Sequence, residues 1–92
     1  ISVDSLKLVY RKTSQELLNI IYTSLSGEDS CDGDRFKAIV LESGDSLGVK
    51  GKKLFFPVRI ALYGDPKGPD IPQIFSILGK DETLKRLFQV IK

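Results

Sequence analysis

The sequence contains no histidine, no methionine and no tryptophan, and Cys31 is its only cysteine. These absences exclude a zinc site built from cysteine and histidine, a disulfide within the chain, and a nucleophile paired with histidine. Cys31 stands in the acidic stretch GEDSCDGD, where neighbouring carboxylates oppose a thiolate, so we expect an inert loop thiol. The composition argues against catalysis, and we predict neither catalytic residues nor a metal site.

Long apolar runs are absent as well. No run approaches the roughly 20 apolar residues that a membrane-spanning helix needs, and no signal-peptide pattern opens the chain. With 92 residues, 41% of them hydrophobic and 28% charged, the chain is predicted to form one small soluble domain over residues 1–92. Because position 1 is isoleucine and not methionine, we expect this domain to be a fragment of a longer protein.

The net charge of +2 is divided unevenly along the chain. Residues 1–49 hold five basic and eight acidic side chains, whereas residues 50–92 hold nine basic and four acidic ones. A basic half predicts a polyanionic partner for one face, with ordinary surface charge as the alternative. The glycines of GVKGKK lack the spacing of a nucleotide-binding loop, so a nucleotide site is not predicted.

A first helix is predicted to begin at Thr13. Thr13 and Glu16 have the spacing of a capping box, and Gly27 ends the apolar repeat that follows them. The residues on its predicted buried face are Leu17, Leu18, Ile21 and Leu25. The preceding segment, VDSLKLVYRK, has the pattern of the end of another helix.

A second helix is predicted over residues 34–46, with Asp32 or Asp34 as its N-terminal cap. Its predicted buried residues are Phe36, Ile39, Val40 and Leu47. The glycines and lysines of SGDSLGVKGKK then indicate a turn.

Two further helices are predicted near the C-terminus. Asp70 would cap the first of them, with Pro72 in its first turn and Gly79 as its left-handed end. Asp81 would cap the second. The apolar positions of the two helices are Ile71, Ile74, Phe75, Leu78, Leu84, Leu87, Phe88 and Ile91.

The stretch FFPVRIALYG, residues 55–64, fits two structures. Alternation of apolar residues at positions 58, 60 and 62 indicates a strand, whereas the apolar residues at 54, 58, 61 and 62 form a helical stripe. Pro57 is tolerated in the first turn of a helix or at the edge of a sheet. We favour the helix because no second strand of similar length is present to pair with it. The predicted fold is therefore all-α, a bundle of about five helices.

Arg59 is the candidate binding residue of this stretch. On the helical interpretation it lies between Phe55 and Tyr63, spaced four residues to either side. Flanking aromatic rings can hold a guanidinium rigid and present it to a base edge or a phosphate. The structural alternative is an arginine whose aliphatic stem packs against the core while its guanidinium reaches the solvent, or one that pairs with Asp65 or Asp70.

The loop after this stretch supplies a second candidate surface. Pro69 and Ile71 are predicted to offer rigid apolar surface on which an unstacked RNA base rests. Gly64 and Gly68 would allow the loop to approach a ligand closely.

A set of ordered motifs covers residues 48–92. They are Lys50-Gly51-Lys52, Pro57-x-Arg59-x-Ala61-Leu62-x-Gly64, Pro69, Leu78-Gly79-Lys80 and Arg86-Leu87. This series closely resembles the C-terminal end of bacterial-type glutamyl-tRNA synthetases, whereas residues 1–47 match that family only in length and helical character.

The resemblance implies an all-helical anticodon-binding domain of a class I synthetase. It implies that Arg59 contacts the anticodon and that Gly68, Pro69 and Ile71 pack against a base. Gly68 departs from relatives that carry a small polar residue there, which leaves only the backbone amide for a hydrogen bond. We expect Lys50, Lys52, Lys53 and Lys67 to attract the tRNA backbone and to make binding depend on salt.

The resemblance also implies a larger enzyme, which uses ATP with Mg²⁺ to join glutamate to tRNA on a domain absent from this chain. The chain itself is expected to need no cofactor and no membrane, and to work as a monomer in the cytoplasm. Its expected partner is glutamate-accepting tRNA, with glutamine tRNA as a second substrate of some members. The rival hypothesis is a non-catalytic helical module whose basic face docks an acidic protein.

Overall fold

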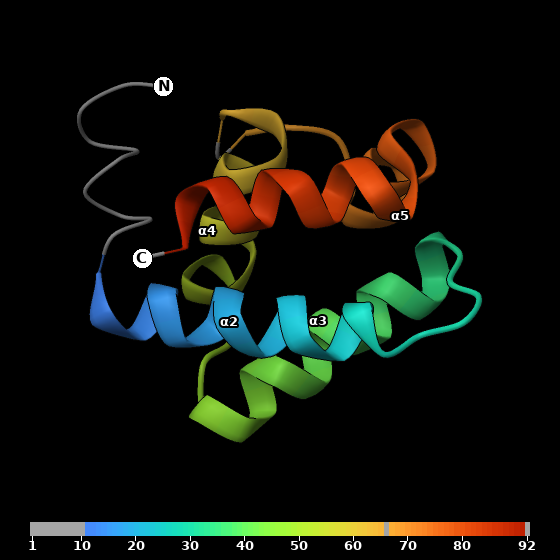
Figure 1. Cartoon of the computed structure of the whole chain (residues 1–92). Coiled ribbons are helices and arrows are strands. Elements are labelled where there is room, and N and C mark those ends of the chain that lie inside the picture. Colours follow the sequence, from blue (N-terminus) through green and yellow to red (C-terminus); the bar gives the residue numbers. More distant parts are fainter. Residues whose placement is uncertain (1–10, 66, 92) are drawn as a thin grey trace.

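A computed structural model describes residues 11–65 and 67–91 of the chain (Figure 1). Within them four helices pack around one core, and no strand is formed. These helices are α2 (Lys12–Ser26), α3 (Gly33–Leu47), α4 (Lys52–Tyr63) and α5 (Ile71–Val90). The all-α prediction is confirmed. The helix end predicted upstream of residue 11 lies outside the described residues.

The predicted count of about five helices is too high for the described chain, because the last two expected helices form one element. In α5 two helical segments are joined across a kink at Gly79, whose φ of 78° and ψ of 171° are not helical. The positive φ agrees with the prediction, but ψ lies far from the left-handed helical region. The predicted break at Gly79 is therefore confirmed, but helix resumes directly after it, so Asp81 is the second residue of the following helical segment and not its N-cap.

The helix N-termini test the capping predictions. Asp32 is confirmed as the cap of α3, because its Oδ1 accepts a hydrogen bond of 2.8 Å from the backbone N–H of Arg35. The capping box at Thr13 is wrong: the extended residue before α2 is Arg11 (φ −62°, ψ 147°), so Thr13 already lies within the helix. A hydroxyl at that position no longer stands where it can cap the first turn.

Asp70 occupies the predicted N-cap position of α5, but its side chain makes no capping hydrogen bond. A capping side chain bonds to the N–H of the second or third helical residue. The second helical residue of α5 is Pro72, which has no N–H. One of the two possible donors is therefore missing.

The stretch 55–64 is helical, as favoured from the sequence. The stripe expected to be buried is inaccessible, with Leu54, Val58, Ala61 and Leu62 each less than a tenth exposed. Pro57, however, is the sixth residue of α4 and not part of its first turn. The carbonyl of Lys53 therefore has no N–H four residues later to accept from, and Lys53 is exposed.

The core lies where all four helices meet. Its largest inaccessible side chains include Phe36, Leu17, Leu18, Ile21, Leu25, Ile60, Leu62 and Leu87. The ring of Phe36 on α3 stacks on that of Phe75 on α5, with centroids 4.8 Å apart and an interplanar angle of 18°. Phe88 was predicted to face the core, but it is 66% exposed, and its ring lies 6.0 Å from that of the partly buried Tyr22.

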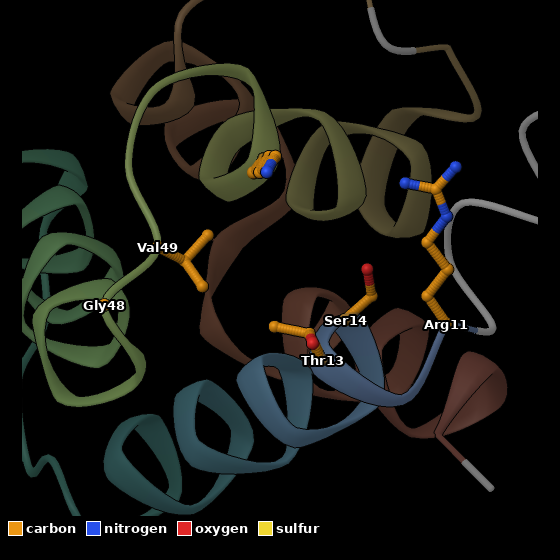
Figure 2. Close-up of a pocket in the computed structure, with 6 residues that line it drawn as sticks. Arg11, Thr13, Ser14, Gly48 and Val49 are labelled. Atoms are coloured by element: carbon orange, nitrogen blue, oxygen red, sulfur yellow. The ribbon is translucent and has the colours of Figure 1, made fainter.

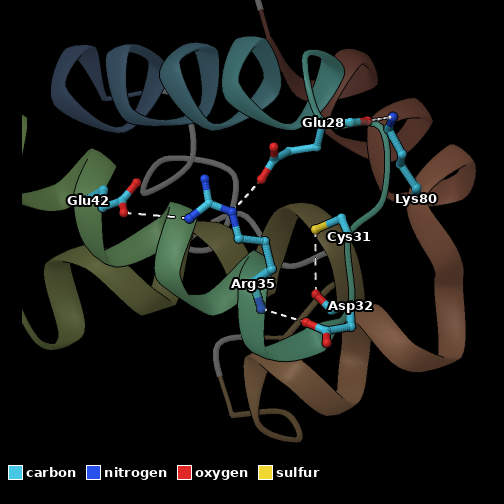
Figure 3. Close-up of polar contacts among 6 residues, drawn as sticks. All are labelled: Glu28, Cys31, Asp32, Arg35, Glu42 and Lys80. Atoms are coloured by element: carbon cyan, nitrogen blue, oxygen red, sulfur yellow. Dashed lines mark hydrogen bonds and ion pairs between the residues drawn. The ribbon is translucent and has the colours of Figure 1, made fainter.

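Polar contacts hold the loop between α2 and α3 in place (Figure 3). Arg35 lies between Glu28 and Glu42 and forms an ion pair with each. The hydrogen bond to Glu28 raises the pKa of the Arg35 guanidinium. Lys80, next to the kink of α5, donates to the backbone carbonyl of Glu28. The loop is thus tied both to α3 and to the middle of α5.

Cys31 lies in the same loop and is free and half-buried. Burial raises the pKa of its thiol, and the carboxylates of Glu28 and Asp32 raise it further. Because the thiolate is the reactive form, a raised pKa lowers the reactivity of the thiol at neutral pH. This agrees with the expectation of an inert loop thiol.

No helix in the described part of the chain is long and apolar enough to cross a membrane.

The close approach of α3 to α5 at Gly33 yields a stability prediction. A Cβ at this position would lie 2.6 Å from the carbonyl oxygen of Pro72, a backbone atom that cannot swing away. We expect Gly33→Ala to lower the free energy of unfolding by about 1–3 kcal/mol, measured by urea denaturation. Gly27→Ala is the matched control, because its Cβ would meet nothing closer than 3.7 Å. Equal effects of the two substitutions would contradict the close packing.

Thr83 on α5 yields a prediction of the opposite sign. Its hydroxyl is inaccessible and finds no hydrogen-bond partner among the described residues. A helical threonine commonly donates to the carbonyl four residues earlier, which here belongs to the non-helical Gly79. We expect Thr83→Val to raise the free energy of unfolding by about 1 kcal/mol. Thr23→Val, at an exposed site, is the control and should change it by less than about 0.5 kcal/mol. A loss of stability in Thr83→Val alone would show that the hydroxyl is bonded in solution.

Candidate nucleic-acid interface

The exposed side of α4 carries Phe55, Arg59 and Tyr63 in a row, because they are spaced by four residues. The guanidinium carbon of Arg59 lies 5.8 Å from the ring centroid of Phe55, within the range of a cation–π contact. Arg59, the one charged residue within this apolar stretch of sequence, therefore lies half-buried at the rim of the core.

The loop after α4 makes the second contact with Arg59. Its Nε donates a hydrogen bond of 3.2 Å to the carbonyl oxygen of Pro69. No ion pair joins Arg59 to Asp65 or Asp70, and Asp65 instead accepts from the N–H of Lys67 at 2.8 Å. The structural alternative of a paired arginine is thus not observed. Arg59 is held by a ring on one side and a loop carbonyl on the other.

Tyr63 packs differently from the prediction. It is 53% exposed and its ring lies against Gly68, where a Cβ would come within 2.8 Å of the ring carbon Cδ2. In the described residues Phe55 is the one ring within cation–π distance of Arg59. The guanidinium is therefore flanked by one aromatic ring and not two.

Of the two residues expected to form an apolar surface for a base, only one has surface to offer. Pro69 is half-buried and stays accessible at the end of the loop. Ile71 is 2% exposed, and it belongs to the core cluster with Ile74 and Phe75. As the first residue of α5 it points inward, so the prediction of an exposed Ile71 side chain is wrong.

The lysines expected to attract a nucleic-acid backbone are all exposed. Lys50 precedes α4, and Lys52 and Lys53 form its first turn. The N-terminus of a helix carries partial positive charge and free N–H groups, and no side chain caps α4. The three lysines thus add to the field of the helix end. Lys67 lies in the loop at the other end of the helix.

Arg86 supports this candidate interface from α5. In the sequence it stood out only as part of the Arg86-Leu87 motif. Its Nη1 donates at 2.5 Å to the carbonyl of Leu62, and its Nε donates at 3.1 Å to Glu82. The last carbonyls of a helix have no N–H donors within the helix, and they attract cations. Arg86 therefore fixes the C-terminal end of α4 against α5, one residue before Tyr63. A cation near a predicted helix end was the signal that could have identified this role.

No group of three or more histidine, cysteine, aspartate or glutamate residues that could hold a metal ion occurs in residues 11–65 or 67–91.

Comparison with known proteins gives the family. The chain matches the anticodon binding domain family over residues 3–91. It belongs to that family. The prediction from the ordered motifs is confirmed in this respect. No solved structure matches the chain.

Curated relatives of this anticodon-binding domain are named glutamate–tRNA ligase. That of Bacillus licheniformis is 42% identical over 77 residues, which cover 84% of the chain and 16% of the relative. That of Staphylococcus saprophyticus is 33% identical over 84 residues, covering 91% of the chain and 17% of the relative. A sequence from Staphylococcus xylosus is 31% identical over 84 residues, which cover 70% of its length. The chain thus spans only 16–17% of the first two relatives.

The contact between Tyr63 and Gly68 can be tested in the anticodon-binding domain itself. We expect Gly68→Ala to displace the Tyr63 ring and to shift its proton resonances in NMR spectra, because the added Cβ overlaps the ring. The exposed ring can move away at low cost, so the free energy of unfolding should change by less than about 0.5 kcal/mol. In a Tyr63→Ala background the same substitution should have no effect on neighbouring resonances. Unshifted ring resonances in the single variant would contradict the contact.

Proposed function

We propose that this domain recognises the anticodon loop of a tRNA as part of a glutamate–tRNA ligase. The observation that carries the proposal is Arg59, which is held between the ring of Phe55 and the carbonyl of Pro69 beside an exposed loop. Family membership and the names of the relatives support it.

The geometry leaves most of the hydrogen-bonding capacity of Arg59 available to a ligand. A guanidinium has five N–H donors, and only the one on Nε is used by Pro69. The four on the terminal nitrogens have no partner among the described residues. A rigidly held fork of this kind suits two-point contact with a base edge or a phosphate. Single-stranded RNA loops are read in this way, through unstacked bases.

The lysines supply the part of the binding that does not depend on sequence. Lys50, Lys52 and Lys53 stand at one end of α4 and Lys67 beyond the other. A strand that passes Arg59 therefore meets positive charge at both ends of the same helix. Neutralisation of phosphates by these side chains would make the affinity fall steeply with salt concentration.

The finer proposals concern the larger protein. We propose that the partner is glutamate-accepting tRNA and that ATP and Mg²⁺ act on another part of the enzyme. We also propose a monomer that works in the cytoplasm. The rival, a module that docks an acidic protein, gains no specific support from the contacts of Arg59. A titration with unmodified tRNA at several salt concentrations separates the two, because only the proposed function expects binding with a steep salt dependence.

Substitution of Arg59 tests the proposal. In the protein that carries this chain, we expect Arg59→Gln to weaken binding of an anticodon stem-loop by about 1–3 kcal/mol, measured by fluorescence anisotropy. Arg59→Lys keeps the charge but not the planar fork, so we expect an intermediate loss. The fold should survive both changes, since among the described residues the guanidinium contacts only the Phe55 ring and the Pro69 carbonyl, both at the rim of the core.

Lys37→Gln is the control for a change of one charge, since Lys37 is exposed on α3. It should alter the affinity only slightly. Equal affinity of the Arg59→Gln variant and the unchanged protein, with both folded, would refute the assignment.

A further inference from the structure

A hollow outside the Arg59 region lies between the start of α2 and the turn that leads into α4. Its volume is about 270 Å³, and its lining residues are Arg11, Thr13, Ser14, Gly48, Val49 and Lys53. A water molecule has a share of about 30 Å³ in the liquid, so the hollow has room for a larger group. Among the described lining residues no side chain is acidic and two are cationic. The lining therefore favours an anion.

The start of α2 supplies donors to this hollow. Its first backbone hydrogen bond runs from the N–H of Gln15 to the carbonyl of Arg11, and the described residues supply no capping side chain. The N–H groups of the first turn therefore have no acceptor within the helix, and the helix dipole places partial positive charge there. Thr13 and Ser14 belong to this turn, and their hydroxyls are further possible donors.

Ser14 gives a second and independent indication of a ligand. Ser14 as a whole is only 6% exposed, and its hydroxyl forms no hydrogen bond to a described residue; unlike that of Thr83, the hydroxyl oxygen keeps some contact with solvent. Figure 2 shows this hydroxyl pointing away from α2 into the space between Val49 and Arg11. A buried polar group is normally satisfied by the protein, by water or by a ligand. A hydroxyl aimed into a cationic hollow is placed to donate to a bound oxyanion.

The two cations come from different helices. Arg11 stands immediately before α2, and its side chain extends to the same side as the Ser14 hydroxyl (Figure 2). Lys53 comes from the first turn of α4, which carries no side-chain cap either. The charges of two separate elements and the free donors of a helix start therefore meet around one space.

We propose that this hollow binds a phosphate group of an RNA backbone. A phosphodiester offers several acceptor oxygens and one negative charge, which matches two cations, two hydroxyls and free backbone N–H groups. The identification of RNA as the source of the phosphate rests on the proposed function. The oxyanion chemistry of the hollow rests on its own residues.

The position along α4 relates this hollow to Arg59. Lys53 and Arg59 are six residues apart on one helix, which corresponds to a rise of about 9 Å. Six residues also turn about 240° around the helix axis, so the two side chains leave different sides of α4. An RNA that contacts both Arg59 and the hollow therefore has to follow the surface around α4.

An NMR titration of the ¹⁵N-labelled chain tests the site directly, with inorganic phosphate as the first probe and an anticodon stem-loop as the second. We expect both to shift the amide resonances of Thr13 and Ser14 in a saturable manner, and the RNA to do so at lower concentration. Ser14→Ala should weaken both by about tenfold, the effect of one hydrogen bond to a charged group. Its thermal stability should be unchanged or higher, because the hydroxyl has no hydrogen-bond partner among the described residues.

The combined variant Arg11→Gln with Lys53→Gln should abolish saturation by phosphate. It should also lower the slope of log affinity against log salt for the RNA by about 0.7–0.9, as expected for one lost phosphate contact. Lys37→Gln is the control for charge and should leave the response of Ser14 to phosphate unchanged. Arg59→Gln should weaken RNA binding but should also leave this response intact.

Three results would overturn the proposal. If neither phosphate nor the stem-loop produced saturable shifts at Thr13 and Ser14, the hollow would not be a binding site. Shifts with phosphate but unchanged RNA affinity in Ser14→Ala would show that free phosphate, and not RNA, is the ligand. Shifts with phosphate in a protein that binds no RNA would refute both the proposed function and RNA as the source of the phosphate. If instead RNA binds equally well to the Arg59→Gln variant and still shifts Ser14, only the anticodon contact of Arg59 is refuted.

Discussion

The buried face of α4 constrains the rest of the structure. Four apolar side chains on this face are almost inaccessible, and they pack against the other three helices: Leu54, Val58, Ala61 and Leu62. Any rotation of α4 about its axis would expose them to water, at a cost of about 25 cal/mol per Å². The rotation of the helix is therefore fixed, and Arg59 must emerge on the rim with the ring of Phe55 beside it.

Because the rotation of α4 is fixed, each of its two ends is held in a defined position. At its C-terminus the carbonyl of Leu62 is held by Arg86, and the following loop returns so that Pro69 accepts from Arg59. At its N-terminus Lys53 is brought beside the start of α2, where Ser14 lies. One packed helix thus places a candidate base contact and a candidate backbone contact at a set separation.

Local chemistry explains which predictions succeeded. Asp32 was identified as a cap because a carboxylate before a helix acts on its own first turn. The prediction of Thr13 as a cap was wrong because the helix begins directly after the extended residue Arg11, two positions earlier, and the sequence offered no signal for that start. Gly79 was identified as a break, but whether the chain ended a helix or kinked within one depended on what followed it in space. The role of Arg59 as a tRNA contact stays a prediction.

The sequence by itself determined the family and indicated the all-α class, and it favoured the helical stripe of α4 over a strand, because periodicity and ordered motifs are properties of the chain alone. Only the tertiary structure decided that Ile71 faces the core, that Tyr63 rests on Gly68, and that Ser14 opens into a cationic hollow. Periodicity shows which side of a helix is apolar, but not which neighbour covers it or which distant side chain stands opposite. That depends on how the helices pack against one another.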